Sequence, residues 1–287
     1  VLAVGDEAKT MLGRTPGNIS AIRPLRDGVI ADFIVTEEMI KHFIKKVHKG
    51  STFANPRILI CVPTGSTPVE RKAIQDSALA AGARKVQLIE EPIAAAIGAG
   101  LPISEATGSM VVDIGGGTTD VAIFSGGAIR HTAVIPIAGD QITSDIAMAL
   151  RASTNEAEAI KLTHGVCKQS LVEKRTEFEV AGLGDRSQNR LLSKNTLAAV
   201  IEPRVEELFS LVSQVSRESG FDELISSGVV LTGGSSLLVG VGELAEDVFF
   251  RQVRVANPNY SGNLADVISN PRYSTAMGLI IEANRDL

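Results

Sequence analysis

The sequence is poor in cysteine and lacks an excess of positive charge. Its 287 residues contain two cysteines, Cys61 and Cys167, whose separation fits neither a metal site nor a disulfide framework. We therefore expect reduced, structural thiols in a cytoplasmic protein. The 28 lysines and arginines against 33 aspartates and glutamates give a net charge of −5. This balance argues against a nucleic acid partner, because proteins that bind nucleic acid carry a basic stripe.

Long apolar runs are absent as well. No run approaches the roughly 18 residues that span a bilayer, so we expect no transmembrane segment, and the first residues do not show the pattern of a signal peptide. The four histidines have no ligand spacing and are assigned no metal. The chain is 44% hydrophobic and 21% charged. This composition is typical of a globular protein that buries a sizeable core in one large or two medium domains.

The pattern of apolar residues predicts an α/β fold. A strand, a helix and a second strand between residues 57 and 92 form a βαβ unit, which indicates a mostly parallel sheet. Pro203 is expected to kink or interrupt a long helix. The other predicted elements are antiparallel strands over 109–114, 119–124 and 128–137, helices over 139–150, 155–165 and 194–220, a strand, turn and helix over 228–249, a strand in "QVRVANP" and a helix in "STAMGLIIEA".

The stretch "VVDIGGGTTDVAIF", Val111–Phe124, places three glycines between two apolar strands. A turn without Cβ atoms can bring its backbone N–H groups against an anion, and phosphate is the usual anion. The stretch therefore predicts a phosphate clamp formed by Gly115, Gly116 and Gly117. On turn preferences alone, a plain glycine hairpin explains the tripeptide equally well.

Polar residues around the glycines favour the clamp. Thr118 and Thr119 can add hydroxyl donors, and Asp113 can hold Mg²⁺ through water. A second glycine turn, Gly233 and Gly234 in "LTGGSSL", follows a buried strand and precedes a helix, whose N-terminus would let the backbone approach a ligand. Taken alone, a simple strand-to-helix turn is an equally good interpretation of this second turn.

The two motifs "DIGGGTTD" and "LTGGSS" resemble the second phosphate loop and the adenosine loop of the actin, heat-shock chaperone and sugar kinase superfamily. The runs "GRTPGNISAIRPLRDGVIADF", "VERKAI" and "AGARKVQLIEEPIAAAIGAGLP" closely resemble MreB, the bacterial actin that sets rod shape, over about residues 3–119. From about 120 to 287, runs such as "NEAEAIKLTHGV" and "YSTAMGL" are similar to FtsA, the actin-like protein of the division septum. Asp120 departs from MreB, which usually has Glu there. A natural divergent member, a chimera and a designed sequence would all show this pattern.

The resemblance implies an actin-like (ribonuclease H-like) fold of two domains, with ATP and Mg²⁺ in a cleft between them. Domain I is expected over 1–108 and 268–287, and domain II over 109–267 with an inserted subdomain at about 152–227. The first strands and the first phosphate loop of the family are expected before Val1. Domain I is therefore expected to be incomplete, with half of the phosphate clamp outside this sequence.

The resemblance also assigns roles to single residues. It places Asp113, Gly115, Gly116, Gly117 and Thr118 in the phosphate loop, and Gly233 and Gly234 in the nucleoside loop. Lys161, in "AEAIK", matches the helix that borders the ribose and base. Glu70, in "PVERKAI", matches the glutamate that positions the attacking water, a role that suits a carboxylate facing a phosphate. Without the resemblance, a helix N-terminal charge is the simpler interpretation of Glu70, and a solvated helix lysine that of Lys161.

The function implied by the resemblance is that of a cytoskeletal protein, at most a slow ATPase. It would bind ATP and polymerise head to tail into filaments, in cell-shape maintenance or cell division. Its partners would be other copies of itself and cell-division or cell-shape proteins at the membrane, and its location the cytoplasm or the inner face of the cell membrane. Two other classes stay open: an adaptor of the same fold that binds nucleotide weakly or not at all, and a small-molecule kinase. A kinase would need a catalytic aspartate beside a sugar pocket, and the sequence offers no convincing one.

Overall fold

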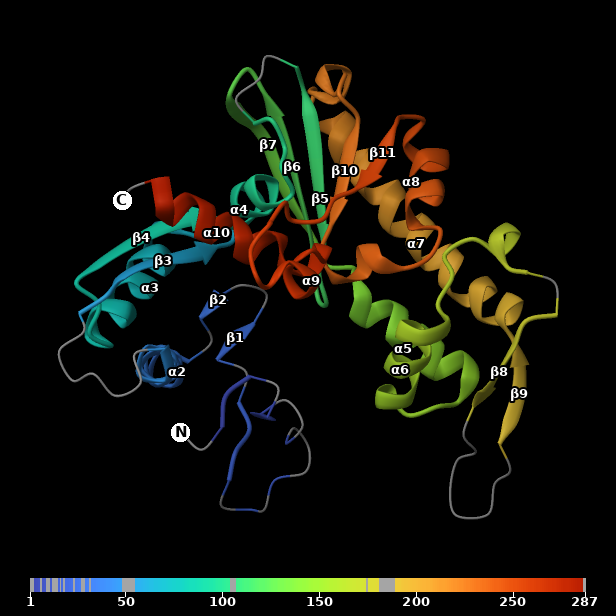
Figure 1. Ribbon diagram of the computed structural model, residues 1–287, viewed down its shortest axis with the longest axis horizontal. Coiled ribbons are helices and arrows are strands. Elements are labelled where there is room, and N and C mark those ends of the chain that lie inside the picture. The colour runs from blue at the N-terminus through green and yellow to red at the C-terminus, as the bar shows by residue number, and fades with distance from the viewer. Residues whose placement is uncertain are drawn as a thin grey trace. The chain divides into compact units, whose positions relative to one another are not determined.

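The chain forms two compact units, Val1–Glu91 and Pro92–Leu287, in the computed structural model (Figure 1). The structure describes residues 3–5, 7–8, 11, 15, 17, 19–22, 24–26, 29–30, 32–47, 55–103, 107–173, 175–180 and 189–285. The domain limits predicted at residues 108 and 268 rest on the family resemblance and stay a prediction.

The first unit contains the predicted βαβ element. β3 (Arg57–Val62) and β4 (Lys85–Glu90) pair in parallel, and α3 (Pro68–Ala80) connects them. Val62 and Ile74 form the buried contact between strand and helix. The same unit holds a short antiparallel pair and a further helix: β1 (Leu25–Arg26), β2 (Val29–Ile30) and α2 (Phe33–Val47).

A five-stranded sheet forms the centre of the second unit, in the order β11–β10–β5–β6–β7 (Figure 1). β5, β6 and β7 are consecutive and antiparallel, which confirms that prediction. β10 pairs in parallel with β5, and β11 in parallel with β10, so the sheet is mixed. The bounds are β5 (Ser109–Ile114), β6 (Thr119–Ser125), β7 (Ala128–Ile135), β10 (Val229–Thr232) and β11 (Val253–Val255).

The rest of the second unit consists of helices and a small hairpin. Their bounds are α4 (Glu91–Gly98), α5 (Gly139–Leu150), α6 (Thr154–His164), β8 (Glu177–Val180), β9 (Arg190–Ser193), α7 (Lys194–Glu218), α8 (Val241–Phe249), α9 (Ala265–Ile268) and α10 (Ser274–Arg285). Short 3₁₀ turns lie at η1 (Gln169–Leu171), η2 (Asp222–Leu224), η3 (Gly234–Leu237) and η4 (Pro271–Tyr273). Within the described ranges, every helix is too short or too polar to cross a membrane.

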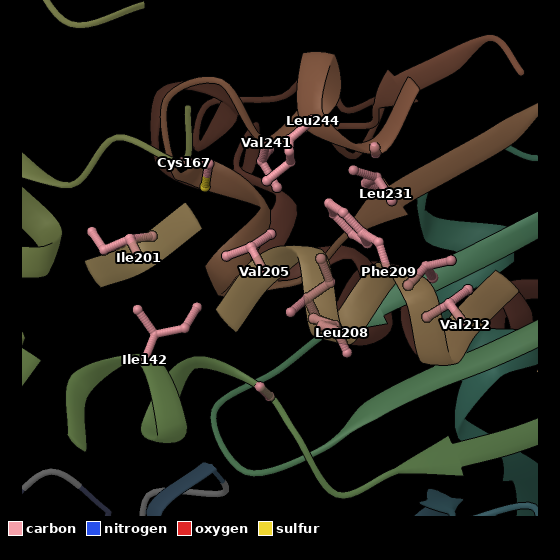
Figure 2. Packing of buried hydrophobic residues seen from close by; sticks show 14 of the residues in the cluster. Ile142, Cys167, Ile201, Val205, Leu208, Phe209, Val212, Leu231, Val241 and Leu244 are labelled. Atoms are coloured by element: carbon pink, nitrogen blue, oxygen red, sulfur yellow. The ribbon is translucent and has the colours of Figure 1, made fainter. Parts of the chain in front are cut away.

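The long helix α7 continues through Pro203, so the predicted interruption is wrong. A proline inside a helix removes one hydrogen bond and costs about 3 kcal/mol. Ile201 on one side of it and Val205 and Phe209 on the other are all buried in one core (Figure 2). Burial of large side chains on both sides stabilises the helix by more than the proline costs, at about 1.5–3 kcal/mol for each side chain.

Alternation along the strands divides the core of the second unit between the two faces of the sheet. Met110 and Ile114 of β5 belong to the large cluster with residues of α5, α7 and α8. Val111, on the other face, packs in a smaller cluster with Ala96 of α4. Asp113 shares the parity of Val111, so it lies on the α4 side of the sheet, where β5 ends and the glycine turn begins.

Candidate functional site

The glycine turn between β5 and β6 is closed by one hydrogen bond, from Gly115 N–H to the Thr118 carbonyl at 3.0 Å. The reverse bond, from Thr118 N–H to the Gly115 carbonyl, is not made between these two described residues. The Gly115 carbonyl instead accepts from Gly139 N–H at 3.2 Å and from the Ser235 hydroxyl at 2.9 Å. Three segments therefore meet at one carbonyl oxygen: the turn after β5, the start of α5 and the turn after β10.

These contacts leave the turn with free donors. A peptide group is planar and trans, so its carbonyl and its N–H point in opposite directions. The Gly115 carbonyl is held as described, and the Gly116 carbonyl accepts from Asp140 N–H at 2.7 Å. The N–H groups of Gly116 and Gly117 consequently point away from α5. In the part of the chain that the structure describes, the N–H groups of Gly116, Gly117 and Thr118 donate to no other group. Successive free N–H groups of this kind form a site for an anion.

The space beside the turn is open. A Cβ atom at Gly117 would have no neighbour within 4 Å, and one at Gly116 would approach the Asp140 carboxylate at 3.5 Å. None of the three glycines of the turn has a φ in the left-handed region. At Gly116 and Gly117 the fold therefore does not require glycine, and the missing side chains keep the N–H groups accessible.

The second glycine turn lies directly against the end of β5. Gly233 has a φ of +86°, and a Cβ atom there would lie 2.4 Å from Asp113 Oδ1 and 2.4 Å from the Ile114 carbonyl oxygen. No other residue fits without displacing β5. A Cβ atom at Gly234 would meet only Cβ of Arg272, at the ordinary distance of 3.9 Å.

The second turn is not followed directly by an α-helix, so that part of the prediction is wrong. The residues after Gly233 form the 3₁₀ turn η3, and α8 begins only at Val241. Val239 pairs with Val166 in an isolated bridge, and Gly240 has a left-handed backbone. The chain is extended at this bridge, and α8 begins seven residues after the first residue of η3.

Two carboxyl groups face each other beside the glycine turn. Asp113 and Asp120 are partners in the register of β5 and β6. Thr275 Oγ1 donates to Asp113 Oδ2 at 2.9 Å, and Thr118 Oγ1 to Asp120 Oδ2 at 3.4 Å. Burial raises the pKa of Asp113, and burial together with the negative charge of Asp113 raises the pKa of Asp120 to about 6. Neighbouring carboxylates with raised pKa values favour a bound cation, which would relieve their repulsion.

The two threonines after the glycines have different environments. Thr119 is buried, and its hydroxyl donates to the Ile137 carbonyl at 2.7 Å. Thr118 is only partly buried, and the hydrogen bond that its hydroxyl donates to Asp120 is long, at 3.4 Å. Thr118 is therefore the better placed of the two to turn its hydroxyl towards a ligand.

Lys161 is buried, with 6% of its surface exposed, so the interpretation as a solvated lysine is wrong. Its ammonium group donates to the Gly139 carbonyl at 3.0 Å and to Thr143 Oγ1 at 2.8 Å, and it pairs with Glu158 at 2.8 Å. These contacts hold the start of α5 against α6. The N–H group of Gly139 also donates to the glycine turn, so Gly139 connects Lys161 to that turn.

Glu70 completes a capping box at the start of α3, in the first unit. Its carboxylate accepts from Thr67 N–H at 2.7 Å and from the Thr67 hydroxyl at 2.9 Å, and Thr67 Oγ1 accepts from Glu70 N–H at 3.3 Å. This arrangement satisfies donors that a helix leaves free at its N-terminus. The predicted role in positioning water stays a prediction.

Four residues of the site were not identified from the sequence: Gly139, Asp140, Ser235 and Thr275. A Cβ atom at Gly139 would lie 2.5 Å from Ser235 Oγ and 3.3 Å from the Gly115 carbonyl oxygen. The signal available was the glycine at the start of a predicted helix, "IAGDQI", where a side-chain cap is more usual.

The arrangement is that of an actin-like fold. The structure of MreB5 of Spiroplasma citri bound to ADP is similar, with a TM-score of 0.82 and 27% identity over 99% of this chain and 85% of that one. The same protein bound to AMPPNP gives a TM-score of 0.81 and 26% identity, over 99% and 86%. The MamK double helical filament, at 20% identity, a TM-score of 0.73 and coverage of 98% and 85%, shares the fold.

The sequence comparisons give the family. The family described as MreB/Mbl protein matches residues 1–264. The cell shape-determining protein MreB of Escherichia coli (strain K12) is 49% identical over 259 residues, which are 85% of this chain and 74% of the relative. The cell shape-determining protein Mbl of Bacillus subtilis (strain 168) is 41% identical over 276 residues, 90% of this chain and 81% of the relative. The chain belongs to the MreB/Mbl family.

Proposed function

We propose that this actin-like cytoskeletal protein binds ATP on its two glycine turns and assembles into filaments that act in cell shape. One observation carries the nucleotide part. Three successive N–H groups, those of Gly116, Gly117 and Thr118, have no acceptor among the described residues, and their carbonyl partners are held away from the open side. The phosphates of the nucleotide would supply the missing acceptors.

The nucleoside would lie along the turn at Gly233 and Gly234, which packs against the end of β5. Lys161, whose ammonium group contacts the start of α5, would lie near the ribose and base. One similar protein, MreB5 of Spiroplasma citri, is bound to ADP in one structure and to AMPPNP in another, which supports the proposal that this chain binds a nucleotide. Glu70 would position the attacking water in slow hydrolysis.

Mg²⁺ fits the same site. The described residues contain no group of three or more metal-ligating side chains, but Mg²⁺ usually needs only one or two carboxylates in addition to phosphate oxygens and water. Asp113 would supply that carboxylate: burial raises its pKa, and it lies opposite Asp120 in the register of β5 and β6. When bound, the ion would neutralise phosphate charge, while Thr275 keeps the Asp113 carboxylate in place.

Titration with a fluorescent ATP analogue tests the nucleotide site. Gly116→Val adds a branched side chain to the phosphate turn, beside the N–H group of its own residue and with Cβ 3.5 Å from the Asp140 carboxylate, while the φ there is allowed for any residue. We expect the variant to fold and to lose most of its affinity. Gly242→Val in α8, where a Cβ atom meets nothing within 4 Å, is the matched control. Binding that survives Gly116→Val would mean that the glycine turn is not the phosphate site.

Filament formation is a separate step, tested by electron microscopy with ATP and Mg²⁺. We expect filaments with ATP and few or none with the Gly116→Val variant. Filaments that form equally well without nucleotide would favour the adaptor alternative. A coupled assay over a panel of sugars would reveal a kinase, for which no described residue gives support.

Cell division is the alternative to cell shape that the resemblance leaves open. Residues from about 120 onwards resemble FtsA in the runs quoted above. On the resemblance to the actin-like superfamily we place domain I over 1–108 and 268–287, and domain II over 109–267 with an inserted subdomain at about 152–227. Partners in shape or division would then meet the protein at the inner face of the membrane. Imaging of a labelled copy in rod-shaped cells separates an arrangement along the side wall from one at the septum.

A further inference from the structure

The Ser235 hydroxyl has an unusual position for a side chain of the nucleoside turn. It donates to the Gly115 carbonyl at 2.9 Å, across 120 positions of the sequence. It is the only side chain among the described residues that donates to a carbonyl of the glycine turn. Ser235 therefore connects the turn proposed for the nucleoside to the turn proposed for the phosphates.

The Gly115 carbonyl can accept hydrogen bonds in either of two orientations. In a tight hairpin with a two-residue loop, it would accept from Thr118 N–H and close the turn. Here it is rotated towards α5, where Gly139 N–H and Ser235 share it. Rotation of this one peptide group frees Thr118 N–H and directs Gly116 N–H to the opposite side.

The hydrogen bond from Gly139 N–H to the Gly115 carbonyl oxygen is at the long end of the normal range, with an N···O distance of 3.2 Å. The Ser235 hydroxyl is closer and comes from a turn that cannot move towards β5, since Gly233 already lies against Asp113 and Ile114. A peptide group next to glycine has little intrinsic preference between the two orientations. A hydrogen-bond donor on a fixed turn can therefore select one of them.

We propose that Ser235 is a positioning residue that keeps the glycine turn in its phosphate-binding conformation. This inference rests on the proposed nucleotide site. Ser235 acts through Gly115 and touches no phosphate itself. Its effect should therefore grow with the number of phosphates on the ligand and vanish for adenosine.

Competition against a fluorescent ATP analogue, with ATP, ADP and adenosine as competitors, tests this. Ser235→Ala should weaken ATP binding about five- to tenfold, as loss of one hydrogen bond predicts, and leave adenosine binding unchanged. Ser235→Thr keeps the hydroxyl and should restore most of the affinity for ATP. Ser236→Ala is the matched control, because that hydroxyl donates to the Gly233 carbonyl at 2.7 Å within its own turn. It should not change the ratio of ATP to adenosine affinity.

The outcomes separate this inference from the proposed function. Wild-type protein that binds no adenine ligand overturns both. Wild-type protein that binds ATP, with a Ser235→Ala variant that weakens ATP and adenosine equally or neither, overturns the inference alone. Amide hydrogen exchange gives a readout without ligand: Thr118 N–H should become more protected in Ser235→Ala, as it recovers the Gly115 carbonyl.

Discussion

Asp113 and Asp120 lie opposite each other on neighbouring antiparallel strands, and both have a raised pKa. The cause is burial in each case, and for Asp120 the charge of Asp113 adds to it. Two neighbouring carboxylates that are largely removed from solvent lower the stability of the folded protein unless a cation or a proton neutralises them. The pair therefore couples the stability of the second unit to pH and to bound metal.

The first prediction concerns this pair at different pH values. An aspartate whose pKa rises from 3.8 to about 6 on folding binds its proton more tightly in the folded state. The free energy of unfolding therefore falls as pH rises through that range. Without nucleotide and with EDTA, Asp120→Asn should raise the free energy of unfolding by on the order of 2 kcal/mol at about pH 8, and by little near pH 4. Urea unfolding at both pH values measures it. A gain independent of pH would contradict this account.

The second prediction compares the two glycines of the nucleoside turn. Gly233→Ala places a Cβ atom 2.4 Å from two oxygen atoms at the end of β5, on a backbone with positive φ. We expect a loss of roughly 2–4 kcal/mol in the free energy of unfolding, from strain and overpacking. Gly234→Ala, with its nearest neighbour at 3.9 Å, should change it by less than about 0.5 kcal/mol. Equal effects at the two positions would mean that the close approach to β5 is not rigid.

The strands around the glycine turn could be predicted because they are local patterns. β5 and β6 were found within one residue of their limits, since their apolar runs are bounded by glycines and a polar turn. The capping box at Thr67 and Glu70 was readable too, as a threonine followed three residues later by glutamate. The sequence interpretation of Glu70 as a helix N-terminal charge agrees with this position, but it does not include the reciprocal hydrogen bonds with Thr67.

The contacts at the Gly115 carbonyl could not be predicted in this way. Gly139 and Ser235 approach it from positions 24 and 120 residues away. Nothing in local periodicity says that the start of α5 and the turn after β10 meet at one oxygen atom. Only the order of strands in the sheet, with β10 beside β5, brings them together. The burial of Lys161 could not be predicted either, because two of its polar partners, Gly139 and Thr143, come from α5 and not from its own helix.

The third prediction follows from these partners of Lys161. Lys161→Met keeps the length of the side chain but removes the ammonium group that donates to the Gly139 carbonyl and to Thr143 and that pairs with Glu158. We expect a loss of about 2 kcal/mol in the free energy of unfolding, from two buried hydrogen bonds and an ion pair whose Glu158 end is exposed to solvent. Lys168→Met, which removes an exposed pair with Asp247, should cost clearly less. Similar losses in thermal unfolding of the two variants would show that Lys161 contributes no more than a surface lysine.

The fourth prediction separates the two roles of Glu70. Glutamine also completes a capping box, so Glu70→Gln should keep the free energy of unfolding within about 0.5 kcal/mol, while Thr67→Ala should lower it by about 1 kcal/mol. If Glu70 also polarises the attacking water, Glu70→Gln should slow ATP hydrolysis at least about tenfold, because the amide cannot accept a proton. Thr67→Ala should keep the hydrolysis rate at a temperature where it is folded. Phosphate release measured beside urea unfolding tests both. A Glu70→Gln variant with unchanged stability and unchanged hydrolysis would leave Glu70 as a helix cap alone, since the carboxylate already has two donors from Thr67 at 2.7 and 2.9 Å.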